Sequence, residues 1–280
     1  MCHKVSRDTI MPILHLVIIA LVQGITEFLP ISSSGHLVLA PMVMGWQDQG
    51  LIIDIAVHVG TLFAVMAYLY RDVGAMAGGL ACALRGRRDP GAKLFFFLVI
   101  GTIPVVIAGF LMHRYLPGGM RSLEVIAWAT LGFGILLWIA DGVGMTVRRI
   151  EHLRVLDVLV IGLAQCLALI PGTSRSGITM TAARLIGMER PDAARFSMLL
   201  SIPTIIAAGT LAGIDLYESG NVDLAADAFV AAGLAFVSAL IAIALMMAWL
   251  RRASFTPFVI YRIILGGILL AYTYNLIPLG

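Results

Sequence analysis

The sequence predicts an all-α polytopic membrane protein with six transmembrane helices and two re-entrant helix hairpins, arranged as an inverted-topology repeat. Its 280 residues are 60% hydrophobic and only 12% charged, against about 25% charged residues in a soluble domain. A surface this poor in charge must face lipid. Apolar stretches of about 20 residues recur, long enough to cross a hydrocarbon core. They are continuously apolar rather than alternating, which excludes a transmembrane β-barrel.

Six uninterrupted apolar stretches predict full membrane spans. The net charge of +3 is too small to indicate nucleic-acid binding. The polar start of the chain lacks the small-residue cleavage site that follows a secretory signal. The predicted spans are 51–70, 94–115, 122–141, 193–215, 225–250 and 257–279.

Two further apolar stretches, 11–45 and 155–187, are each interrupted by a polar break. The breaks are Pro30 to His36 and Pro171 to Gly177. About 10 apolar residues follow each break, too few to span as a straight helix. Non-helical backbone at membrane depth survives only where protein or a water-filled cavity surrounds it. We therefore expect two re-entrant helix hairpins. The alternative, an ordinary aqueous loop between two spans, leaves the short arms unexplained.

The two halves of the chain repeat the same order of elements within a single membrane domain, 1–280. The first repeat, 11–142, and the second, 155–279, each contain one hairpin and three spans. Because three is odd, the second copy enters the membrane from the opposite side, as in inverted-repeat transporters. Three residues recur 142 positions later, namely Gln23, Gly35 and Gly45 as Gln165, Gly177 and Gly187.

The basic residues between spans predict the orientation. They fall on one side of the six-span arrangement, which the positive-inside rule makes cytoplasmic. The connection at 215–227 on the other side is acidic and has no Lys or Arg. Both termini are then expected outside, where Lys4 and Arg7 count against this orientation. The cytoplasmic set is Arg71, Arg85, Arg87, Arg88, Lys93, Arg148, Arg149, Arg154, Arg190, Arg251 and Arg252.

The hairpins carry ionisable residues inside the predicted membrane. Each such residue costs about 2.5–3.5 kcal/mol on the insertion scale, so we treat Glu27, His36 and Arg175 as functional candidates. Gln23 lies four residues before Glu27 and therefore shares its helix face. A helix starting after each break would present free N–H groups to an anion, and a guanidinium grips phosphate oxygens in pairs.

Structural roles for these residues stay open at this point. Ser32 could be only a helix cap, and Glu27 could be a structural hydrogen-bonding group. Arg175 could pair with Glu27 simply to hold the hairpins together. His58 lies inside a predicted span and remains ambiguous.

Two motifs resemble those of the bacterial undecaprenyl-diphosphate phosphatases, the bacitracin-resistance protein family. Residues 23–37, QGITEFLPISSSGHL, resemble the first motif of that family, and residues 171–177, PGTSRSG, resemble the second. The resemblance extends to the closing segment 257–262, PFVIYR, and covers essentially the whole chain.

The resemblance implies an integral membrane phosphatase that hydrolyses undecaprenyl diphosphate to undecaprenyl phosphate and inorganic phosphate. Such an enzyme recycles the lipid carrier for peptidoglycan and cell-wall biogenesis, supports cell shape and confers bacitracin resistance. It implies a multi-pass protein of the bacterial inner membrane, with its site open to the periplasm. The resemblance also implies a divalent cation, Mg²⁺ or Ca²⁺, to neutralise the diphosphate. A homodimer is a further expectation.

The resemblance also assigns roles to residues. Glu27, Ser33, His36 and Arg175 become the catalytic candidates, with either Ser33 or His36 as nucleophile; we favour Ser33, with His36 as its base. Glu27 is the candidate metal ligand. The family's first acidic position can be Glu or Gln and is here the neutral Gln23, so the metal would rest on Glu27 and the substrate's phosphates. The candidate substrate- and phosphate-binding residues are Gln23, Ser32, Ser34, Gly35, Ser174, Ser176 and Gly177.

Other functions fit part of the pattern. A transporter or flippase of polyprenyl phosphate would share the inverted repeat, but it would not need the Glu, Ser and His cluster. A structural subunit would leave the intramembrane charges unexplained. The phosphatidic-acid-phosphatase-related acid phosphatases also use an SGH tripeptide, but they need a histidine soon after an SR motif. Residues 176–185, SGITMTAARL, contain none, which excludes that family.

Overall fold

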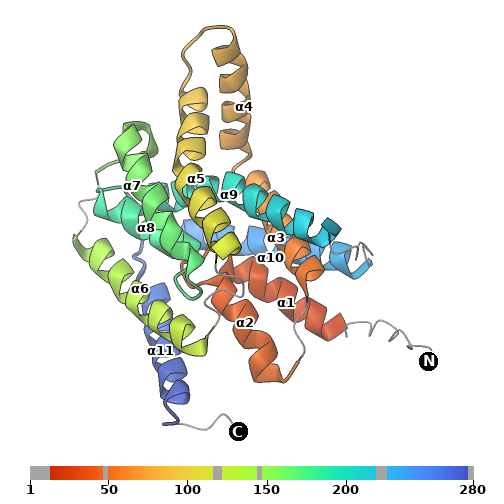
Figure 1. Cartoon of the computed structure of the whole chain (residues 1–280). Helices are drawn as coiled ribbons and strands as arrows, with labels where there is room; N and C mark the ends of the chain where they lie inside the picture. Colours follow the sequence, from red (N-terminus) through yellow and green to blue (C-terminus); the bar gives the residue numbers. More distant parts are fainter. Residues whose placement is uncertain (1–12, 47–49, 116–121, 144–146, 219–225, 277–280) are drawn as a thin grey trace.

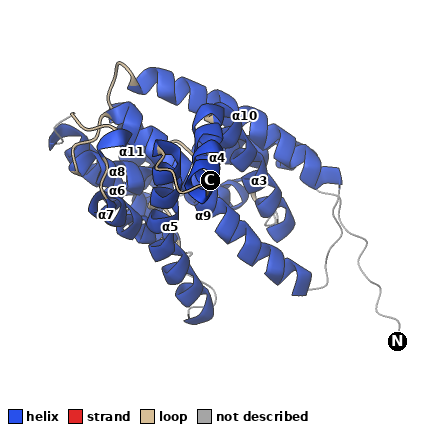
Figure 2. Ribbon diagram, turned by 90° about the horizontal axis from the view of Figure 1, so that it is seen from above, coloured by secondary structure: helices blue, strands red, loops and turns tan. Residues whose placement is uncertain are grey.

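A computed structural model describes residues 13–46, 50–115, 122–143, 147–218 and 226–276. Within these residues the regular elements are helices joined by loops and turns (Figure 2). An isolated β-bridge pairs Arg148 with Met188. Six helices are long and apolar enough to cross a membrane, as the sequence predicts, although the end of the last predicted span lies outside the described residues. They are α3 (Leu51–Tyr68), α5 (Pro90–Tyr115), α6 (Leu123–Val143), α9 (Arg190–Glu218), α10 (Ala226–Leu250) and α11 (Thr256–Thr273).

The two predicted breaks interrupt helices where the sequence places them. The first separates α1 (Ile13–Thr26) from α2 (Ser33–Met44). The second follows α7 (Val155–Gln165) and the 3₁₀ turn η2 (Cys166–Leu169), and precedes α8 (Arg175–Leu185). The matched glycines Gly45 and Gly187 follow α2 and α8 with φ of 66° and 88°. This left-handed conformation favours glycine and commonly ends a helix.

Between the predicted spans 51–70 and 94–115 the sequence analysis expects no helix, but Tyr70–Leu84 form helix α4. This helix packs along the first part of α5, and the two project together from the rest of the molecule (Figure 1). With 15 residues, this helix is too short to count as a membrane span by the length of its apolar run. In the structure Gly79 lets the helices approach closely, since a Cβ there would lie 2.3 Å from the Ala92 nitrogen. Arg71 and Lys93 are therefore helical residues.

The hairpin helices pack against spans from the other half of the chain. Helix α1 lies against α10, and α7 lies against α5. Helices α3 and α10 form another close pair, as do α6 and α11, and α3 also contacts α9. The main apolar core surrounds α8 and α9, where Met180, Phe196 and Leu199 are fully buried. This arrangement brings the two breaks to the middle of the molecule.

The outer surface of the six long helices is apolar. Large side chains stay exposed on every one of them, which a soluble monomer rarely allows over a contiguous area. This surface is consistent with a multi-pass membrane protein. Examples, one from each span, are Phe63, Phe110, Trp138, Ile206, Leu245 and Ile264.

Candidate active site

The tips of the two breaks touch each other. The Ser176 hydroxyl donates a hydrogen bond of 2.8 Å to the carbonyl oxygen of Leu29 in the first break. A Cβ on Gly35 would lie 3.7 Å from the Cα of Gly172 in the second break. Beside this contact lies a cavity of about 360 Å³ that polar and apolar side chains line together. Its wall includes Glu27, Ser32, Ser33, Ser34, Asp54, His58, Ser174, Arg175 and Thr204.

Glu27 is the centre of the cavity's hydrogen bonds. It follows the last residue of α1 and is 7% exposed. Arg175 donates a hydrogen bond of 2.9 Å to Glu27 Oε1 from the opposite break. Glu27 Oε2 accepts a bond of 2.9 Å from the Gln23 amide and one of 2.6 Å from the Ser33 hydroxyl. A buried carboxylate needs such partners, because an unpaired buried charge is very costly.

The two breaks repeat one backbone geometry. Ser32 and Ser174, directly before α2 and α8, have φ of 77° and 72°. Each hydroxyl accepts a hydrogen bond from the backbone N–H three residues later, of Gly35 at 3.3 Å and of Gly177 at 3.1 Å. Both helices therefore start at the cavity wall. The positive ends of their dipoles favour a phosphate group there.

The predicted binding residues divide into two sets. Ser32, Ser34 and Ser174 line the cavity. The others do not line the cavity; they contact the residues of the breaks from outside it. Gln23 is fully buried against Glu27, and a Cβ on Gly177 would lie 2.8 Å from a guanidinium nitrogen of Arg262. Gly35 and Ser176 likewise contact the opposite break.

His36 does not line the cavity with the other catalytic candidates. Its Nδ1 lies 2.6 Å from the Ser32 carbonyl oxygen, and its Nε2 lies 2.5 Å from the Tyr261 hydroxyl on α11. The two rings stack, with their centroids 5.7 Å apart. The imidazole therefore contacts α11 rather than Ser33, and its predicted catalytic role stays a prediction.

The imidazole on the cavity wall belongs to His58 of α3. Its Nε2 is 3.9 Å from Glu27 Oε2, and its Nδ1 lies 2.7 Å from the Asp54 carbonyl oxygen. The backbone carbonyl can only accept, so Nδ1 carries the hydrogen and Nε2 faces the carboxylate. The sequence leaves the role of His58 open, because the hydropathy of α3 does not show which face of the helix turns toward the cavity.

Arg262 on α11 contacts both breaks, although the sequence does not single it out as a site residue. It is completely buried, and its guanidinium donates hydrogen bonds to the carbonyl oxygens of Pro30 at 3.3 Å and Gly172 at 3.0 Å. Two further bonds reach the carbonyls of Ala129 and Thr130 on α6. Arg262 thus ties both breaks to α6. A charged residue inside an apolar span was the available signal.

The residues present do not build a metal centre by themselves. Within the described ranges no group of three His, Cys, Asp or Glu side chains is placed to hold an ion. Both oxygens of Glu27 already accept hydrogen bonds, one of them from the Arg175 cation. Mg²⁺ usually takes one or two carboxylates together with substrate phosphates. The divalent cation therefore stays a prediction, as does Glu27 as its ligand.

Comparisons with known proteins agree on one family. Residues 16–268 match the family described as bacitracin resistance protein BacA. Undecaprenyl-diphosphatase 1 of Rhodospirillum rubrum is 53% identical, over 94% of this chain and 96% of the relative. Undecaprenyl-diphosphatase of Ruegeria pomeroyi is 54% identical, over 95% of this chain and 100% of the relative. The protein of the same name from Alteromonas mediterranea is 47% identical, over 94% of this chain and its own full length.

Proposed function

The chain belongs to the family of bacitracin resistance proteins BacA, and on this premise we propose that it is an undecaprenyl-diphosphatase. It cleaves the terminal phosphate from undecaprenyl diphosphate. The observation that carries this proposal is the position of Glu27, whose carboxylate accepts hydrogen bonds from the Ser33 hydroxyl at 2.6 Å and the Arg175 guanidinium at 2.9 Å. A hydroxyl, a base and an anion-binding cation thus meet on one cavity wall.

In the first step Ser33 attacks the terminal phosphorus. Its proton passes to Glu27, which lies within direct hydrogen-bond reach. The bond from phosphorus to the bridging oxygen breaks, and undecaprenyl phosphate leaves with the electron pair. Arg175 and the first turns of α2 and α8 hold the charged phosphate oxygens, where electrostatic stabilisation has its largest effect.

In the second step a water molecule attacks the phosphoserine. The bond between Ser33 Oγ and phosphorus breaks, and Glu27 returns its proton to the serine oxygen. Inorganic phosphate leaves with the water's hydrogens. Glu27 thus acts first as base and then as acid. His36 as base or nucleophile is the competing assignment, and it would require the ring to leave Tyr261.

The inverted-topology repeat and the re-entrant course of the hairpins belong to the same proposal. The equivalent geometry of Ser32 and Ser174 supports two copies of one unit, as do the paired contacts of α1 with α10 and α7 with α5. Helix α4 has no counterpart among the described residues of the second half. A pseudo-two-fold axis explains this pattern, because it would relate the contact of α1 with α10 to the equivalent contact of α7 with α5.

The location of the cavity supports a site open to the periplasm of the inner membrane. Its wall includes Leu51 to His58 at the start of α3 and Thr204 to Ala212 in the second half of α9. Both parts lie toward the ends that the basic-residue distribution puts outside. Product released there re-enters the carrier cycle of peptidoglycan synthesis. Removing undecaprenyl diphosphate from that leaflet also gives bacitracin resistance.

The activity can be tested on purified protein in detergent by measuring phosphate release from undecaprenyl diphosphate. We expect activity in the parent protein and a loss of orders of magnitude in Glu27→Ala, Ser33→Ala and Arg175→Ala, whereas a loss of that size in His36→Ala would favour the competing assignment. His152→Ala, at an exposed histidine that does not line the cavity, is the control and keeps full activity. Full activity in all three site variants would end the assignment. A chelator in the same assay tests the divalent cation, and light scattering of the purified protein tests the homodimer.

A transporter of polyprenyl phosphate is the second candidate, because duplicated broken helices are typical of alternating access. It differs from the enzyme in needing Arg175 but not Ser33. Transport in proteoliposomes that persists in Ser33→Ala, without phosphate release, would favour this candidate. Fold alone does not decide between the two.

A further inference from the structure

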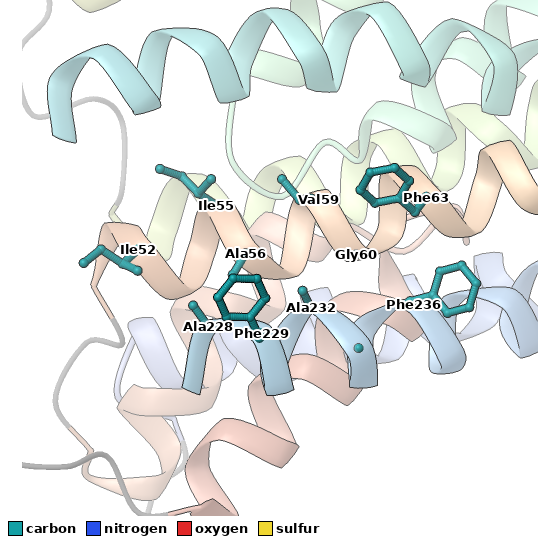
Figure 3. A pocket seen from close by; sticks show the side chains of 11 residues that line it. Ile52, Ile55, Ala56, Val59, Gly60, Phe63, Ala228, Phe229, Ala232 and Phe236 are labelled. Carbon is teal, nitrogen blue, oxygen red and sulfur yellow. The ribbon is translucent and has the colours of Figure 1, made fainter. Parts of the chain in front are cut away.

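An apolar groove runs along the outside of the molecule between α3 and α10 (Figure 3). Its volume is about 540 Å³. The side chains of Ile52, Val59 and Phe63 come from α3, and those of Phe229 and Phe236 from α10. Among the described residues that line the groove, none is charged. It is shaped by side chains from two helices that lie far apart in the sequence.

The depth of the groove follows from the close contact of the two helices. A Cβ on Gly60 would lie only 2.1 Å from the Ala232 carbonyl oxygen, so the backbones touch there. Small residues form the floor, and large aromatic rings stand at its sides. Phe63 is 57% exposed and Phe229 is 72% exposed. These exposed rings border an open apolar groove.

The groove and the cavity of the candidate site lie on adjacent faces of α3. Ile55 lines both. Along α3, Asp54 and His58 face the cavity, whereas Ala56 and Val59 face the groove. These residues lie on adjacent faces of the same helical turns, which places the groove and the cavity at similar depth. A molecule with a charged head and an apolar chain fits this pair of spaces.

We infer that the groove between α3 and α10 binds the isoprenoid chain of the substrate while its diphosphate occupies the cavity. The inference rests on the proposed function. Lipid tails are as apolar as leucine side chains, so the groove gains little from the hydrophobic effect. Its contribution is van der Waals contact and alignment of the chain, which hold the head group against Ser33. Ile55 lies where the head group meets the chain.

Gly233 offers a direct test, because it lines the groove and has open space around its Cβ position. Gly233→Leu places a branched apolar side chain at the groove from a position where the added Cβ itself meets no atom within 4 Å. We expect KM for undecaprenyl diphosphate to rise by about tenfold, the scale of a missing or blocked apolar contact, while kcat stays near that of the parent. Inhibition by inorganic diphosphate, which has the head group but no chain, stays unchanged. Gly267→Leu on α11 is the matched control, since that glycine is also exposed with open space.

The outcomes separate this inference from the proposed function. A parent protein that releases no phosphate overturns the proposed function itself. An active parent whose KM is the same in Gly233→Leu and Gly267→Leu overturns the groove and indicates that ordinary membrane lipid fills it. A parallel change in inhibition by inorganic diphosphate also overturns it, because the effect then passes through the cavity. If Gly233→Leu does not fold, Phe229→Ala tests the same groove by removing one wall, with an expected threefold rise in KM, about half the tenfold effect on a free-energy scale.

Discussion

At the first break Ser32 has a φ of 77°, and at the second Ser174 has a φ of 72°. Each hydroxyl caps the helix that follows, through the N–H of Gly35 or Gly177. The next residue differs, because α2 starts with Ser33 and α8 with Arg175. The same backbone thus presents a hydroxyl at one tip and a guanidinium at the other, and Glu27 contacts both.

This difference shows how two breaks with the same backbone geometry can carry different chemical groups. A helix start offers a site for an anion whatever its side chains. The first break adds an acid and a hydroxyl, and the second adds a permanent positive charge. Neither hairpin holds the complete set. The predictions below test this division, from the largest expected effect to the smallest.

The largest effect is expected for Glu27→Gln, which removes the base of the first break. We expect activity to fall by about 10³-fold, the scale of general acid–base catalysis. Arg175 would also lose its partner charge, which lowers the free energy of unfolding by about 3–5 kcal/mol. Phosphate release and thermal unfolding in detergent measure the two effects, with Glu124→Gln at an exposed position as control.

The double variant Glu27→Gln, Arg175→Met separates stability from catalysis. Removing both charges should restore most of the unfolding free energy, because no buried charge is left unpaired. Activity should stay lost. Recovery of activity in the double variant would contradict a catalytic role for the two residues.

Arg262→Met removes the clamp that the two breaks share. The carbonyl groups of Pro30 and Gly172 would stay buried without their donor, so we expect the free energy of unfolding to fall by about 3 kcal/mol. Activity should also fall, because the relative position of Ser33 and Arg175 is no longer fixed. Thermal unfolding and phosphate release measure these changes, and unchanged values for both would show that the breaks hold their positions independently.

Arg175→Lys keeps the charge of the second break but not its two-pronged geometry. We expect kcat/KM to fall by about tenfold to a hundredfold. The planar guanidinium of arginine can donate hydrogen bonds to Glu27 and to a phosphate at the same time, whereas the lysine ammonium cannot reproduce this geometry. Arg71→Lys, on the exposed side of α4, is the control. Parental kcat/KM in Arg175→Lys would mean that only the charge matters at this position.

The smallest effects are expected at the two caps. Ser32→Ala and Ser174→Ala should each lower the free energy of unfolding by about 1 kcal/mol, because each removes one hydrogen bond to a helix start. Ser174→Gly should cost less than Ser174→Ala, since glycine tolerates a φ of 72°. Equal losses at the two serines would support equivalent breaks, and a clear difference would argue against them.

The sequence alone determined the membrane class, the six spans and the places of both breaks. Each depends on local properties, namely the length of an apolar run and the effect of Pro30 and Pro171 on a helix. The grouping of Glu27 with Ser33 and Arg175 was also predictable, because an ionised group inside a membrane needs a partner. The matched Gly45 and Gly187 indicated where the short helices end.

The tertiary structure alone decided how those helices are turned about their axes. His36 contacts Tyr261, a residue 225 positions away, and His58 faces Glu27 instead. Helix α4, the clamp by Arg262 and the groove beside Gly233 depend in the same way on segments far apart in the chain. The direction of a side chain depends on packing between such segments. A hydropathy pattern does not show which segments contact each other.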